Sequence, residues 1–196
     1  MGARNGGRSE RVVRDVLSAA IAELARSGYG ALRVEDVADL AGVNKTTVYR
    51  RWPTKGDLVA AAVRAVAGHH EPPPDTGTAR GDLVEMLGRA IAFARTAEGR
   101  AITRLITAEG GDPDVDRLSR SLRDSVMDQR SHIIVRAQER GELPKGLDVQ
   151  MMIDAIFSPV MMRVLRFGEE VDGPTAAAFV DLIITGAQHG AGALRR

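Results

Sequence analysis

The sequence lacks cysteine altogether, has three lysines among its 27 basic residues, and carries aromatic side chains at only 4% of its 196 positions. Without cysteine, a disulfide scaffold, a cysteine-ligated zinc site, an iron–sulfur centre and a thiol nucleophile are excluded. No apolar run approaches the roughly 18 residues that a membrane span requires. The first residues also lack the apolar stretch of a secretion signal. These absences predict a globular, intracellular protein that does not enter a membrane.

The net charge is low as well, because 27 basic residues nearly balance 26 acidic ones. This balance excludes a protein that is basic over its whole surface, but it does not exclude a basic face. Residues 1–65 hold 11 basic and seven acidic residues, a net +4, whereas the remaining 131 residues carry −3. The asymmetry favours an anionic partner for the first third of the chain, and chance sampling is the alternative.

Apolar residues recur along almost the whole chain at the period of about 3.6 residues that is typical of amphipathic helices. Glycine, proline and N-cap residues interrupt this pattern, and no strand, hairpin or repeat pattern is present. Asn44 and Asp112 are the expected N-caps of the helices that follow them, and Thr54 with Asp57 has the pattern of an imperfect capping box. The sequence therefore predicts an all-α fold of about nine helices. The predicted helices cover residues 9–27, 34–41, 45–52, 54–67, 82–96, 100–109, 113–141, 149–167 and 175–191.

Residues 68–81 interrupt the helical pattern with three consecutive prolines, which is typical of a linker. We therefore expect an N-terminal domain at 1–67, with a flexible basic tail at 1–8, and a C-terminal domain at 82–196. The predicted helices at 149–167 and 175–191 are apolar around most of their circumference, so both of their faces must be covered. A second copy of the chain would cover one face, which predicts a homodimer through these two helices.

The segment RVEDVADLAGVNKTTVYRRW, residues 33–52, has the pattern of a helix-turn-helix. Two steeply crossing helices require a small residue at the crossing and a left-handed residue in the turn, and Ala38 and Gly42 meet these needs. The exposed side of the second helix would then present hydroxyl and cationic side chains, which suit phosphate oxygens and base edges. An ordinary helical hairpin with a solvated polar face is the alternative.

The run LRVEDVADLAGVNKTTVYRRWPTKGDLVAAAV resembles the DNA-binding domain of TetR-family (tetracycline-repressor-type) bacterial regulators. The resemblance lies in the AGV turn, the T-x-Y of the second helix, Trp52 after it, and Lys55 and Leu58 in the next helix. It covers about residues 9–67, and the number and order of the other helices agree with the family's nine-helix plan. It implies a cytoplasmic bacterial homodimer that binds a palindromic double-stranded DNA operator, usually as a repressor, until a small molecule enters the C-terminal domain.

The resemblance also implies roles for individual residues. Thr47 and Tyr49 are expected to contact the DNA backbone, and Lys55 is expected to contact a phosphate. Lys45 and Thr46 occupy the positions nearest to the bases, while Trp52 is expected to pack within the small domain. The predicted DNA-contacting residues are Arg33, Asn44, Lys45, Thr46, Thr47, Tyr49, Arg50 and Lys55.

Two basic features lie outside the second helix of this motif. Arg33 stands where the family often has threonine, so it loses a hydroxyl cap but can still reach a phosphate. The tail at residues 4–14 would add sequence-independent affinity or lie in the minor groove, and a disordered leader is the alternative.

The C-terminal part contains six of the methionines and all four phenylalanines. Adaptable thioethers beside aromatic rings suit a pocket for an apolar or flat ligand, and ordinary core packing is the alternative. Gln129 and His132 are the polar candidates in this part. The candidate pocket residues are Met86, Phe93, Leu105, Met127, Phe157 and Met161.

No catalytic or metal-binding pattern is present. The adjacent His69 and His70 cannot share a helix face, and Asp128 with His132 is more typical of a solvated pair than of an ion site. No nucleophile elbow, phosphate-binding loop or dinucleotide motif occurs. The sequence thus predicts a DNA-binding regulator without a cofactor. The alternatives are a helical ligand-binding or scaffolding protein whose helix-turn-helix is only structural and, third, a small enzyme.

Overall fold

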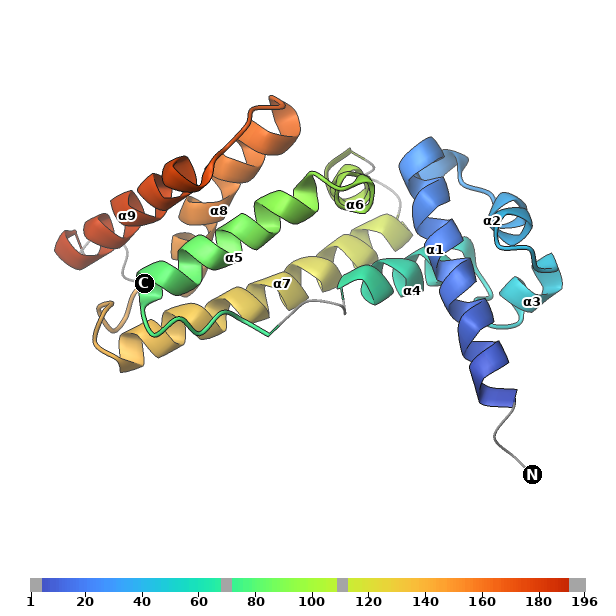
Figure 1. Ribbon diagram of the computed structural model, residues 1–196, viewed down its shortest axis with the longest axis horizontal. Coiled ribbons are helices and arrows are strands. Elements are labelled where there is room, and N and C mark those ends of the chain that lie inside the picture. The colour runs from blue at the N-terminus through green and yellow to red at the C-terminus, as the bar shows by residue number, and fades with distance from the viewer. Residues whose placement is uncertain (1–4, 68–71, 109–112, 191–196) are drawn as a thin grey trace. The chain divides into compact units, whose positions relative to one another are not determined.

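The computed structural model describes residues 5–67, 72–108 and 113–190. Within these ranges the regular elements are all helices, apart from one isolated bridge residue. The all-α prediction is confirmed, as Figure 1 shows. The nine helices of the described chain are α1 (Asn5–Ala31), α2 (Val34–Leu40), α3 (Lys45–Tyr49), α4 (Lys55–Ala67), α5 (Ala79–Ala94), α6 (Ala97–Ala108), α7 (Pro113–Glu139), α8 (Val149–Arg166) and α9 (Gly173–His189).

Helix α1 starts four residues before the predicted helix, so residues 5–8 of the predicted tail are helical. Residues 1–4 lie outside the described residues. The predicted end at Gly28 is where the helical backbone breaks, because this glycine has φ 76° and ψ 169°. A last turn follows to Ala31. A residue with a Cβ adopts such a positive φ only under strain, which explains why glycine marks this break.

Capping side chains fix the starts of most of these helices. The backbone N–H of Thr54 donates to Asp57 Oδ2 at 3.1 Å, and the N–H of Asp57 donates to Thr54 Oγ1 at 3.0 Å, so the predicted capping box of α4 is confirmed. Helix α5 begins three residues before the predicted start, because Thr78 Oγ1 accepts from the Gly81 N–H at 3.0 Å. The predicted cap Asp112 lies outside the described residues.

The described chain forms two compact units. One unit contains α1 to α4, α6 and the part of α7 before residue 121, and the other contains α5, the rest of α7, α8 and α9. The predicted linker at residues 68–81 lies between α4 and α5, although its last three residues belong to α5. The sequence did not predict that α6 packs against α1, as α2 and α4 also do.

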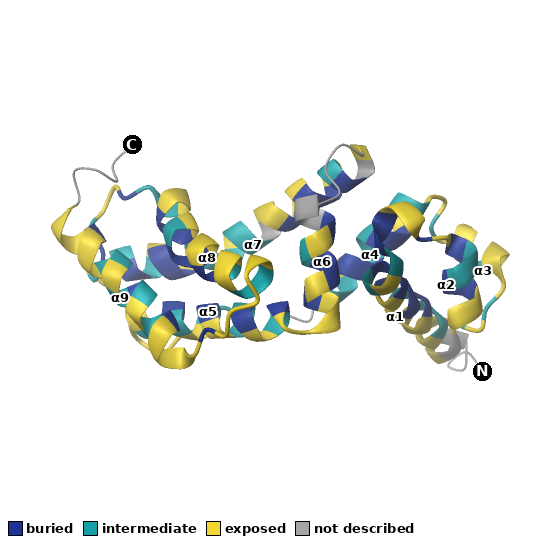
Figure 2. Cartoon of the chain, turned by 90° about the horizontal axis from the view of Figure 1, so that it is seen from above, coloured by how far each residue is buried: buried dark blue, intermediate teal, exposed yellow. Residues whose placement is uncertain are grey.

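Each unit has its own apolar core, and burial alternates along each helix between a covered stripe and a solvated one (Figure 2). In the first unit the core side chains include Val16, Leu24 and Leu58, all at most 1% exposed. In the second unit α5 packs against α8 and α9. Its core is built around residues that share near-complete burial: Leu83, Leu87, Ile133, Ile134, Ile153, Ile156, Phe157, Val160 and Val180.

The second unit also contains one fully buried carboxylate, that of Asp82 near the start of α5. Its Oδ1 accepts from the backbone N–H of Thr76 at 2.6 Å and from the Thr76 hydroxyl at 2.8 Å. Its Oδ2 lies 3.1 Å from Arg136 Nη2 and 3.4 Å from Arg140 Nη2, both on or just after α7. The carboxylate therefore joins the segment before α5 to the C-terminal end of α7.

Candidate nucleic-acid interface

Helices α2 and α3 are joined by the turn that the sequence predicts. Gly42 has φ 65°, and the N–H of Val43 donates to the carbonyl of Ala38 at 2.9 Å, which closes the turn. Ala38 is 1% exposed at this crossing, and Val37 and Val48 are fully buried between the helices. The small residue, the glycine and the apolar wedge thus fix the angle between α2 and α3.

Asn44 holds the start of α3. Its Oδ1 accepts from the backbone N–H and from the hydroxyl of Thr46, both at 2.9 Å, so the predicted N-cap is confirmed. The amide group of Asn44 has no partner within the described residues and lies on an exposed side chain. The cap makes a helix of only five residues a rigid support for the side chains that follow.

The exposed side of α3 carries hydroxyl and cationic groups. Lys45 and Thr46 are exposed, and Tyr49 is 40% exposed. Arg50 directly follows the helix and is exposed too, but it also lines a small cavity that faces α1. The ammonium of Lys45 lies 3.9 Å from a carboxylate oxygen of Glu35 on α2. Both side chains are solvated, so this ion pair is weak and a DNA phosphate can replace Glu35 as the partner of Lys45. These residues are brought together as predicted, and their contacts with DNA stay a prediction.

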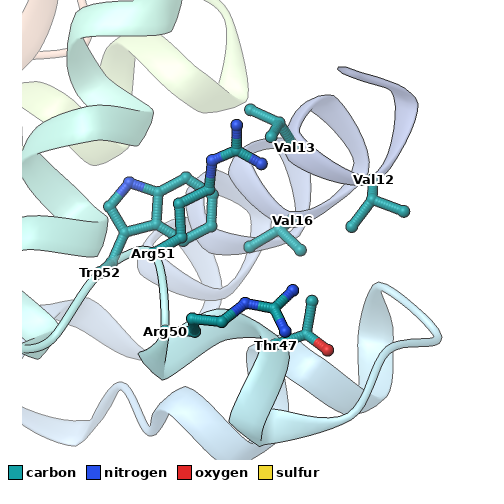
Figure 3. Close-up of a pocket in the computed structure, with 7 residues that line it drawn as sticks. All are labelled: Val12, Val13, Val16, Thr47, Arg50, Arg51 and Trp52. Carbon is teal, nitrogen blue, oxygen red and sulfur yellow. The ribbon is translucent and has the colours of Figure 1, made fainter. Parts of the chain in front are cut away.

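Thr47 lies on the other side of α3, half-buried beside a small cavity of about 130 Å³. Figure 3 shows that Val12, Val13 and Val16 of α1 line this cavity opposite α3 and the turn after it. Trp52 also lines it, so this ring packs against α1 within the small domain. Arg51, on the rim, donates to Ser9 Oγ at 3.4 Å and ties the end of α3 to the start of α1.

Lys55 makes contacts that the sequence did not predict. Its Nζ donates to the carbonyl of Tyr29 at 2.8 Å and lies 4.3 Å from the centre of the Tyr29 ring. The last carbonyls of a helix lack intrahelical partners and carry partial negative charge, which attracts a cation. Lys55 therefore fastens the start of α4 to the end of α1, and its predicted phosphate contact stays a prediction.

Arg33 is the exposed N-cap of α2, and its side chain makes no capping hydrogen bond. This agrees with the predicted loss of a hydroxyl cap and leaves the guanidinium available to a phosphate. The predicted minor-groove arm falls partly outside the described residues, because residues 1–4 are not described and residues 5–14 belong to α1.

Two family descriptions match the chain over most of its length. "Bacterial regulatory proteins, tetR family" matches residues 16–62, and "Tetracyclin repressor-like, C-terminal domain" matches residues 73–183. The chain belongs to the TetR family. It is therefore a helix-turn-helix transcriptional regulator, and because the family is not one of enzymes, the enzyme alternative is excluded.

Relatives of this TetR-family chain are similar over nearly their whole length. YdeS of Bacillus subtilis, an uncharacterized HTH-type transcriptional regulator, is 31% identical over 86% of each chain. The DNA-binding transcriptional repressor TetR of Mycobacteroides abscessus is 30% identical over 86% of this chain and 90% of its own. The crystal structure of the TetR family transcription regulator SCO0332 has 33% identity and a TM-score of 0.69, and covers 89% of this chain and 97% of its own.

In the C-terminal part of this TetR-family chain, the structure brings together four of the six candidate pocket residues. Phe157 is a core residue of the second unit, and Met86, Met127 and Met161 are half-buried against that core. Phe93 is half-buried on α5, whereas Leu105 is fully buried in the other unit. The proposed pocket set is therefore not one cluster.

The sequence missed one polar residue beside this core. Of the polar candidates, Gln129 is half-buried and His132 is exposed, but Arg130 between them lies over the ring of Phe157, 3.6 Å from its centre. The signal was its position three residues after Met127 and three before Ile133, which places it on the apolar side of α7.

Among the described residues, no three histidine, aspartate or glutamate side chains are grouped closely enough to hold a metal ion. His69 and His70 lie outside these residues. No described helix has the length and apolar character needed to cross a membrane.

Proposed function

We propose that this TetR-family regulator is a homodimeric repressor that binds a palindromic DNA operator through α3 and is released by a small molecule bound among its C-terminal helices. The observation that carries the proposal is the exposed polar face of α3 on a turn fixed by Gly42 and a start fixed by Asn44. Its amine, hydroxyl and guanidinium groups suit phosphate oxygens and the edges of bases in the major groove. The similarity to a DNA-binding repressor supports the sign of regulation, and such a repressor acts in the cytoplasm, where the operator lies.

A homodimer is supported by large apolar side chains left exposed on α8 and α9. Met162 is 52% exposed, Phe167 at the end of α8 is 65% exposed, and Leu182 on α9 is 68% exposed. Burial of one such side chain contributes about 1.5–3 kcal/mol, and a two-fold axis buries each of them twice. We therefore propose that α8 and α9 of two protomers pack together, as the sequence predicts.

Release requires that the effector favours a dimer whose two α3 helices no longer match the DNA. Half-sites one turn apart require about 34–36 Å between recognition helices. Moving the dimer from nearly all bound to nearly all released requires about 5.5 kcal/mol of differential effector binding. Helix α4 connects the DNA-binding helices to the rest of the chain, and α6 packs against α1, so both are routes for this coupling.

An electrophoretic mobility-shift titration tests DNA binding, with the DNA upstream of the protein's own gene as the probe at two salt concentrations. Wild-type protein should bind tightly and lose affinity steeply as salt rises, because phosphate contacts release counterions. Lys45→Ala at a base contact should cost about 1–3 kcal/mol and relax specificity, whereas Tyr49→Phe at a backbone contact should weaken binding to every sequence.

Arg64→Ala is the matched control for these variants. Arg64 is an exposed cation in the same unit, but it lies on α4 rather than on α3. Its replacement should change affinity much less than Lys45→Ala does. Equal effects of the three substitutions, or none, would show that α3 is not the recognition surface.

A further inference from the structure

Arg130 stands out because a cation occupies the apolar side of α7 in the second unit. The Cζ atom of its guanidinium lies over the ring of Phe157, 3.6 Å from the ring centre, and Phe157 itself is 2% exposed. An arginine at a helix surface normally extends into water, whereas Arg130 is half-buried and its guanidinium lies against this ring. Stacking on the aromatic face satisfies part of its charge, but it supplies no hydrogen-bond acceptor.

No described residue supplies the missing acceptor. Within residues 5–67, 72–108 and 113–190, no carboxylate lies within 4.0 Å of the Arg130 guanidinium, and no hydrogen bond to it is formed. The acidic group that faces it, Asp154 of α8, instead accepts from Gln150 Nε2 at 2.8 Å and is exposed. Burial lowers the pKa of Arg130 to about 10, and the more distant charge of Asp154 only partly opposes this.

The surroundings of this cation are soft and apolar. Met127 lies one turn before Arg130 on α7, and Met86 and Met161 are half-buried against the same core as Phe157. Thioethers adapt to ligands of irregular shape, and a few fixed polar groups among apolar side chains are typical of small-molecule sites. A half-buried arginine adds the one group that pairs with a planar anion through two parallel hydrogen bonds.

We propose that Arg130 binds the anionic head of the effector, so that the effector is an amphiphilic anion with a carboxylate, sulfonate or phosphate on an apolar body. This inference rests on the proposed effector response and names the chemical class of the ligand. The apolar body lies against Phe157 and the neighbouring methionines, and the head replaces the acceptor that Arg130 lacks in the chain alone. A neutral molecule of the same shape would leave the arginine unpaired and would bind more weakly.

Two fluorescent probes that differ in charge test the proposal directly. 1-Anilinonaphthalene-8-sulfonate carries a sulfonate, whereas N-phenyl-1-naphthylamine has a similar aromatic body without it. Arg130→Met should weaken binding of the sulfonate probe about 10-fold or more, because a hydrogen bond to a charged group is lost, and should change binding of the neutral probe about two-fold at most. Arg123→Met is the control, since Arg123 is an exposed cation on the same helix.

Equal affinity of wild type and Arg130→Met for the sulfonate probe would overturn the proposal. An equal loss of affinity for the sulfonate probe and the neutral probe would overturn it too. Circular dichroism checks folding, and Arg130→Gln provides a second uncharged variant with a polar head. A further test needs no variant: decanoate should displace the bound sulfonate probe from the wild-type protein at about 10-fold lower concentration than decan-1-ol does. Equal displacement by both would also overturn the proposal.

Measuring DNA binding and probe binding on the same protein distinguishes a failure of this proposal from a failure of the proposed function. If wild-type protein fails to shift operator DNA, the proposed function is wrong whatever the probes show. If it shifts the DNA but its affinity for the sulfonate probe does not depend on Arg130, the assignment of Arg130 alone is wrong.

Discussion

Replacing Asp82 with asparagine removes the charge of a fully buried carboxylate while preserving its shape. Asparagine presents one acceptor and one NH₂ group, so either Thr76 or the pair of arginines must face a donor instead of an acceptor. Removing one partner of a buried ion pair costs about 3–5 kcal/mol. The Arg136 and Arg140 side chains remain 29% exposed and keep some hydration, so we expect a loss of about 3 kcal/mol in the free energy of unfolding.

This loss should depend on pH. Burial by itself raises the pKa of Asp82, but the hydrogen bonds from Thr76, the charge of Arg136 and the hydrogen bond from Arg140 outweigh it, so the pKa lies below its ordinary value. A carboxyl group with a depressed folded pKa stabilises the protein above its unfolded pKa of about 3.9. That contribution disappears as the pH falls through the folded pKa. The difference between wild type and variant should be complete above about pH 5 and should shrink below about pH 4.

Urea unfolding followed by circular dichroism, at one protein concentration and at about pH 7 and pH 3.5, measures both effects. In a separate thermal melt at neutral pH, the same loss should lower the melting temperature by about 6–12 °C for a chain of this size. Asp181→Asn is the matched control, because its carboxylate pairs with Arg80 at 2.6 Å on the surface and should contribute far less. A loss no larger than that of Asp181→Asn, or a difference that does not shrink in acid, would refute the reasoning.

Leu182→Glu should convert the dimer into monomers in sedimentation experiments, because it places a charge in the proposed α8–α9 interface. The control is Val135→Glu, at a 43% exposed apolar residue of α7, which should leave the dimer intact. A dimer that survives Leu182→Glu would show that another surface holds the protomers together. Lys55→Met should lower the free energy of unfolding by about 1 kcal/mol through loss of its hydrogen bond to the Tyr29 carbonyl. Unchanged stability with weakened, less salt-dependent DNA binding would assign Lys55 to a phosphate instead.

Local signals in the sequence predicted much of this fold and of the site. The turn at Gly42, the cap at Asn44 and the reciprocal cap of Thr54 with Asp57 depend on residues no more than four positions apart. Such signals fix helix ends and the exposed face of α3 without knowledge of the rest of the chain. The start of α5 was predicted three residues late because residues 68–81 were assigned to the linker, while the cap in the structure is Thr78.

The contacts that the sequence did not predict join residues far apart along the chain. A helical period shows which face of α6 is apolar, but not that this face meets α1. Likewise, the resemblance to the TetR family implied a phosphate contact for Lys55, and only the fold places this lysine beside the carbonyl of Tyr29. Arg130 was overlooked because charged residues are counted as solvated unless a distant partner such as Phe157 is known.

The membership of α6 in the first compact unit has a consequence for hybrid regulators. The chain passes from one unit to the other three times, near residues 70, 96 and 120, rather than once at the proline-rich segment. A hybrid that exchanges everything after that segment would give α1 a foreign α6, with side chains that did not evolve against it. A hybrid that keeps residues 97–120 with the native DNA-binding helices would preserve this packing and confine the exchange to α5, the end of α7, α8 and α9.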